Sequence, residues 1–139
     1  MTRQPLVPVS WGELLDKITI LEIKRDRIED AAARQNVEKE LELLTGIAGE
    51  ALEHAPLDRL RAVNAALWDI EDAIRAEETR GSFGPEFIRL ARAVYQRNDE
   101  RAAIKRELNA LLGSELVEEK SYWSAAAEPP NSLPTGPRL

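Results

Sequence analysis

The sequence predicts an all-α protein, an antiparallel bundle of about four helices joined by short loops. Ala, Leu, Glu, Lys and Arg make up about half of the 139 residues, a proportion typical of long helices. Two prolines, Pro56 and Pro85, lie between residues 9 and 128, and proline breaks the interior of a helix. The middle of the chain therefore has room for a few long helices.

Two helices are expected in the first half of the chain. The first spans residues 10–30, because residues 10–13 read S-W-G-E, the S-x-x-E pattern of a capping box, in which a hydroxyl and a carboxylate satisfy N–H groups of the first turn. The second spans residues 33–53. Gly46 and Gly49 weaken it by about 1 kcal/mol each relative to Ala, so we expect a bend or early fraying there.

Two longer helices and a tail are expected in the second half. We expect helices over residues 56–81 and 85–112, because each segment begins with a proline and ends at or directly before a glycine. Residues 114–122 are expected to be a short ordered tail. The division that follows is one helical-bundle domain over residues 1–123 and a disordered tail over residues 124–139, which holds four of the eight prolines.

Composition excludes several classes of function. The net charge of −6 argues against a general nucleic-acid binder. The chain has no cysteine, and hence no disulfide framework or thiolate metal site. It contains no apolar run long enough to span a membrane and no export leader, so we expect a cytoplasmic protein. No phosphate loop, nucleophile elbow or metalloprotease motif is found, and we expect no metal or cofactor.

Polar side chains interrupt the apolar faces of three predicted helices. At about 100° per residue, Asn98, Arg101, Lys105 and Asn109 fall in the middle of the apolar face of the helix over residues 85–112. The first and third helices repeat the pattern. Because a buried charge is costly unless it is paired or hydrogen-bonded, something must meet these groups.

Two interpretations of the inward polar groups remain open. In the first, Glu22 and Glu71 neutralise Arg25 and Arg101, and the network only sets the helix register. In the second, a cationic surplus binds a phosphate or carboxylate, to which the planar arginine fork is suited. The candidate ligand-binding residues share an inward-facing position and are Arg25, Asn64, Trp68, Glu71, Arg75, Asn98, Arg101 and Lys105.

A second apolar strip predicts association of two copies. Ile20 and Ile23 lie on the back of the first helix, away from its main apolar face. A second strip on one helix usually has a second neighbour. We expect a homodimer through this helix.

Five strings along the chain resemble a family of small bacterial proteins of unknown function. They are residues 9–24, 63–75, 83–88, 95–101 and 116–122, and the resemblance covers about residues 9–122. It implies a shared helical scaffold and a link to surface-polysaccharide or glycosyltransferase pathways. It carries no catalytic residues that could be transferred to this chain.

The leading functional expectation is a non-enzymatic accessory protein whose inward cluster holds an anionic small molecule or an acidic segment of a protein partner. One alternative is a small enzyme acting on an anionic metabolite. All-helical chorismate mutases show, by analogy of architecture only, that Arg, Lys and Glu inside a bundle can catalyse through electrostatic preorganisation. Another alternative is a purely structural dimerising adaptor, in which the polar cluster sets the register.

Overall fold

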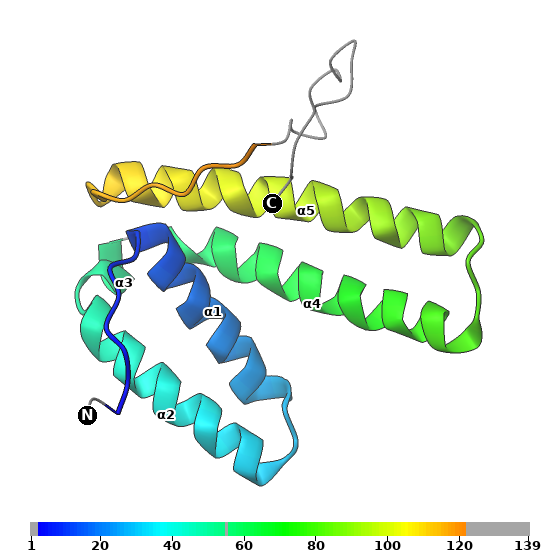
Figure 1. Cartoon of the computed structure of the whole chain (residues 1–139), viewed down its shortest axis with the longest axis horizontal. Coiled ribbons are helices and arrows are strands. Elements are labelled where there is room, and N and C mark those ends of the chain that lie inside the picture. The colour runs from blue at the N-terminus through cyan, green and yellow to red at the C-terminus, as the bar shows by residue number, and fades with distance from the viewer. Residues whose placement is uncertain (1–2, 55, 122–139) are drawn as a thin grey trace. The chain divides into compact units, whose positions relative to one another are not determined.

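The computed structural model describes residues 3–54 and 56–121, and helices are the regular secondary structure that these residues form (Figure 1). The helices are α1 (Trp11–Arg27), α2 (Ala31–Ala48), α3 (Ala51–His54), α4 (Leu57–Arg80) and α5 (Pro85–Leu111). The predicted fold class is confirmed. Five helices form in place of about four because the expected second helix is interrupted.

The interruption lies at Gly49, one of the two glycines expected to weaken that helix. Gly49 ends α2 with a backbone φ of 53°, a left-handed conformation that glycine adopts without steric cost. Its N–H still donates to the carbonyl of Thr45. The chain then resumes as the single turn α3.

Helix boundaries follow local capping chemistry elsewhere in the chain. Asp30 caps α2 by accepting a hydrogen bond from the N–H of Ala33. Gly81 and Gly113, which follow α4 and α5, both take a φ of 64°. Residues 114–121 carry no regular secondary structure.

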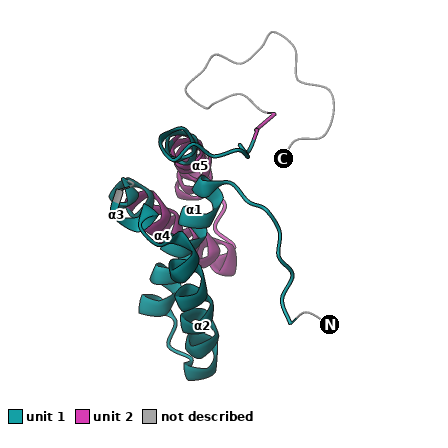
Figure 2. Cartoon of the chain, turned by 90° about the vertical axis from the view of Figure 1, so that its left-hand side faces the viewer, with its two compact units in different colours: residues 1–61, 104–118 teal, residues 62–103, 119–139 magenta. Residues whose placement is uncertain are grey.

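The described residues group into two compact units, coloured separately in Figure 2. Among these residues, unit 1 comprises 3–54, 56–61 and 104–118, and unit 2 comprises 62–103 and 119–121. The expected single domain over residues 1–123 stays a prediction. The tail expected over residues 124–139 lies outside the described residues.

Unit 1 is built around the antiparallel pair α1 and α2, which pack directly on each other (Figure 1). Its fully buried side chains include Leu15 and Ile18 from α1, Leu60 from the first turns of α4, and Ile104 and Leu108 from the end of α5. Segments far apart in the sequence therefore share one apolar core, whose burial provides the main stabilisation.

Unit 2 is a helical hairpin. The remainder of α4 and the first part of α5 run antiparallel and are joined by residues 81–84 (Figure 1). Val63, Leu67 and Leu90 are buried, and the rings of Phe83 and Phe87 meet edge to face near the connection. Among the described helices, none combines the length and apolarity needed to cross a membrane.

Candidate functional site

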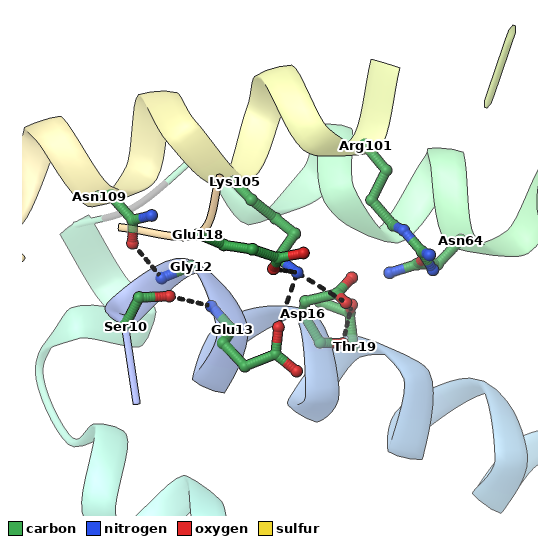
Figure 3. A network of polar contacts seen from close by, with 10 residues as sticks. All are labelled: Ser10, Gly12, Glu13, Asp16, Thr19, Asn64, Arg101, Lys105, Asn109 and Glu118. Atoms are coloured by element: carbon green, nitrogen blue, oxygen red, sulfur yellow. Dashed lines mark hydrogen bonds and ion pairs between the residues drawn. The ribbon is translucent and has the colours of Figure 1, made fainter. Parts of the chain in front are cut away.

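The first turn of α1 is capped by side chains from two distant parts of unit 1 (Figure 3). The N–H of Glu13 donates to Ser10 Oγ at 3.1 Å, as the S-x-x-E pattern predicts. The N–H of Gly12 donates to Asn109 Oδ1 at 2.6 Å, and that of Trp11 donates to Ser114 Oγ at 3.2 Å. Three N–H groups that a helix start leaves without intrahelical partners are thus satisfied.

Gly12 allows this arrangement because it has no side chain. A Cβ at this position would lie 2.6 Å from the backbone oxygen of Lys105 and 3.0 Å from Asn109 Oδ1. The backbones of α1 and α5 therefore approach each other more closely here than any other residue would permit. The glycine of the S-W-G-E string serves a tertiary contact as well as a helix start.

Lys105 lies beside this contact and is surrounded by carboxylates (Figure 3). Its Nζ donates to Glu13 Oε2 at 2.7 Å and to Glu118 Oε2 at 2.9 Å, and it lies 3.8 Å from Asp16 Oδ2. The Lys105 side chain is 12% exposed and that of Asp16 is 8% exposed. We call this set, Lys105 with Glu13, Asp16 and Glu118, the Lys105 latch.

The charge of Lys105 is maintained by its neighbours. Burial, the largest single influence, lowers the pKa of this ammonium group, but the hydrogen bonds to Glu13 and Glu118 and the charge of Asp16 together outweigh it. The pKa of Lys105 is therefore raised above its ordinary value.

The Lys105 latch joins three segments of unit 1: the start of α1, the end of α5 and the extended residues that follow α5. Glu118 belongs to that extended segment, and Ser114 anchors the same segment to Trp11. Three carboxylates around one ammonium group leave a negative excess. The latch therefore suits an internal structural connection better than the capture of an anion.

A second ion pair in unit 1 involves Arg61, which the sequence did not single out. Its Nε and Nη2 donate to the two carboxylate oxygens of Glu22 at 3.0 and 3.3 Å, and its Nη1 donates to Asp58 at 3.1 Å. The hydrogen bond to Glu22 is the main cause of the raised pKa of Arg61. One interpretation of the sequence paired Glu22 with Arg25. In the structure, Glu22 pairs with Arg61 instead.

Three of the predicted site residues lie at the surface. Arg25 pairs with its neighbour Asp26 at 3.1 Å, and both are exposed. Glu71 pairs with Arg75 at 3.8 Å along the same helix, and the Arg75 side chain is 80% exposed. The expected neutralisation of Arg101 by Glu71 is therefore replaced by a surface pair within α4.

The other four predicted residues belong to unit 2. Arg101 is half-buried, and its Nη1 donates to the amide oxygen of the buried Asn64 at 3.2 Å (Figure 3). Trp68 follows Asn64 by one helical turn on α4, and Asn98 precedes Arg101 by one turn on α5; both are half-buried. We call these four residues the Arg101 cluster. Arg101 donates to a neutral amide, whereas Lys105 donates to carboxylates.

Sequence reasoning missed the carboxylates of the Lys105 latch. Glu13 was assigned only to the capping box, yet its carboxylate accepts from Lys105. Glu13 and Asp16 lie one turn apart and share a helix face, which was an available signal. Glu118 lies outside any helix and has no periodicity that could have indicated its role.

The fold and the contacts define a small all-helical protein with an internal ionic latch in one unit and an arginine–asparagine cluster in the other. The chain belongs to the family of unknown function DUF6165, whose model matches residues 6–136. The expected resemblance to an uncharacterised family is thereby confirmed. Comparisons with curated proteins and with solved structures find no match.

Proposed function

We propose that the protein is a non-enzymatic binding protein that holds a small anionic ligand at the Arg101 cluster of unit 2. The observation that carries the proposal is the neutral partner of Arg101. Arg101 donates to the amide oxygen of Asn64 at 3.2 Å. This oxygen carries no formal charge, so a bound anion would supply the negative charge that the contact lacks.

The chemistry of the guanidinium supports a carboxylate or phosphate as the ligand. The hydrogen bond from Arg101 to Asn64 uses Nη1, whereas carboxylates and phosphates are commonly bound through two parallel N–H groups of one arginine. Asn98, one turn away on the same face of α5, carries an amide donor that suits the same ligand. Trp68 offers a planar surface for a ring attached to the anionic group.

The proposal omits four residues of the expected ligand-binding set, which are Arg25, Glu71, Arg75 and Lys105. Arg25, Glu71 and Arg75 form surface ion pairs, which contribute little energy and organise no enclosed site. Lys105 is engaged by three carboxylates. The ligand-binding set therefore narrows to Asn64, Trp68, Asn98 and Arg101.

A thermal-shift screen tests the proposal directly. Wild type, Arg101→Met and the control Arg25→Met are compared against nucleotide sugars, sugar phosphates, nucleotides and aromatic carboxylates. Nucleotide sugars come first because the family resemblance implies a link to surface polysaccharides. Ligand binding to the native state raises the melting temperature.

We expect a compound that stabilises wild type and Arg25→Met but not Arg101→Met. Isothermal titration calorimetry of that compound should then show binding to Arg101→Met that is at least about tenfold weaker, because the ligand loses a charged hydrogen-bonding partner. A screen in which every shift is the same in all three proteins, or in which no compound produces a shift, would contradict the proposal.

A further inference from the structure

The outward side of α5 in unit 2 carries a strip of side chains with the spacing of a coiled-coil seam. Its members are Ile88, Arg92, Tyr95, Asp99 and Ala102, which we call the α5 strip. The intervals of four, three, four and three residues average 3.5, the heptad period that keeps one stripe of a helix facing a partner helix.

The two large apolar members of the α5 strip, Ile88 and Tyr95, are exposed, whereas Asp99 and Ala102 are half-buried. Ile88 is 55% exposed and Tyr95 is 65% exposed. By contrast, Ile20 and Ile23, where the sequence predicted a dimer contact, are half-buried and therefore less exposed than Ile88 and Tyr95. The α5 strip therefore exposes larger fractions of its apolar side chains than the predicted dimer face of α1 does.

Charge placement identifies the occupant of this face. Tyr95 lies three residues after Arg92 and four residues before Asp99. If two copies of α5 pack antiparallel about a two-fold axis beside Tyr95, Arg92 of one copy comes level with Asp99 of the other, to within about one residue rise of 1.5 Å. The symmetry repeats this pair on the other side of the axis.

The apolar residues match under the same symmetry. Ile88 lies seven residues before Tyr95, and Ala102 lies seven residues after it. The two-fold axis therefore sets the large Ile88 side chain of one copy against the small Ala102 of the other. Tyr95 meets its own symmetry mate at the centre, where aromatic residues contribute most to binding.

We propose that the α5 strip is a homodimer interface in which two copies of this chain pack antiparallel. Burial of Tyr95 and Ile88 supplies the affinity, because exposed ion pairs contribute little. The Arg92–Asp99 pairs, which lie within the strip, set the register and orientation, because only this antiparallel alignment brings opposite charges level with each other.

Sedimentation velocity of the full chain over a wide range of concentration tests the interface. Wild type should shift from the monomer mass of 15.6 kDa to twice that value. Tyr95→Glu should weaken association about tenfold or more. The control Ile47→Glu changes another exposed apolar residue, on α2, and should leave the dimer unchanged.

A charge-exchange experiment tests the register. Arg92→Glu and Asp99→Arg should each weaken the homodimer, because like charges then face each other across the axis. An equimolar mixture of the two variants should restore a dimer, since both inter-chain pairs become complementary. Far-ultraviolet circular dichroism of each variant establishes that the helices are retained.

Three outcomes would overturn the proposal: wild type that stays monomeric at every concentration, a dimer that survives Tyr95→Glu, or mixed charge variants that do not associate. A dimer abolished by Ile20→Glu with Ile23→Glu but unaffected by Tyr95→Glu would assign the interface to α1 instead.

Discussion

Lys105 and Arg101 lie one turn apart on α5, yet their surroundings differ in charge. Lys105 contacts three carboxylates within unit 1, whereas Arg101 donates to a neutral amide within unit 2. Both were predicted from the same interrupted apolar face. An inward cation is therefore not by itself evidence of a ligand site, because the charge of its partners decides whether it connects the fold or can accept an anion.

The largest effect expected from this comparison is the loss of the Lys105 latch. Lys105→Met leaves the buried Asp16 and its two companion carboxylates without their cation, which should lower the free energy of unfolding by about 3–5 kcal/mol. Chemical denaturation measures the change. Lys17→Met is the matched control, because Lys17 forms an exposed ion pair with Glu40 and should cost no more than about 1 kcal/mol.

If Lys105→Met is as stable as wild type, the latch is not a structural connection. Lys105 would then return to the set of candidate ligand-binding residues, and the contrast with Arg101 would be lost.

The close approach of α1 and α5 predicts the next largest effect. Gly12→Ala places a methyl group against the Lys105 backbone oxygen, and backbone cannot move aside as a flexible side chain can. We expect a loss of about 1–3 kcal/mol in the free energy of unfolding. Gly46→Ala in α2 has open space around its Cβ and should instead stabilise the protein by up to about 1 kcal/mol.

Equal and small effects of the two glycine substitutions on the denaturation midpoint would show that the backbone contact at Gly12 is not tight in solution. The composite cap from Asn109 and Ser114 would then need a different explanation.

Arg101→Met tests the same comparison at the cation that donates to an amide instead of to carboxylates. This substitution removes a single hydrogen bond to a neutral amide, so the free energy of unfolding should fall by no more than about 1 kcal/mol without ligand. Chemical denaturation beside Lys105→Met gives the ratio of the two effects. A loss as large as that of Lys105→Met would mark Arg101 as a structural residue and remove the basis of the proposed anion site.

The smallest expected effect is a dependence on alkaline pH. The pKa of Lys105 is raised above its ordinary value of 10.5, so its contribution to stability is fully present below that pH and declines as pH rises through the folded-state pKa. Burial opposes the carboxylates in setting this pKa, which keeps the effect small. The stability difference between wild type and Lys105→Met should narrow at high pH in urea titrations, and a constant difference would contradict the assignment.

Local sequence patterns accounted for most helix boundaries. Ser10 caps α1, Pro85 begins α5, and Gly49 interrupts the second predicted helix. These outcomes depend on interactions within a few residues, namely side-chain capping, the fixed φ of proline and the left-handed conformation of glycine. Such interactions can be read from neighbouring letters of the sequence.

Helical periodicity also identified Asn64, Arg101, Lys105 and Asn109 as polar residues on apolar faces, but it could not name their partners. A helical wheel gives the direction of a side chain about its own axis and carries no information on which distant segment lies opposite. Glu118, in a segment without periodicity, and Arg61, on the first turns of α4, were therefore missed.

The sequence alone determined an all-α chain, its helix starts and stops, and the inward position of Asn64 and Asn109, because these follow from short-range backbone chemistry and the 3.6-residue period. The expected inward position was wrong for three other residues, Arg25, Glu71 and Arg75. Only the tertiary structure decided which of the inward polar groups are neutralised. Whether a buried cation meets carboxylates or an amide depends on contacts between segments such as Glu13 and Lys105, separated by ninety-two residues, and folding alone brings such segments together.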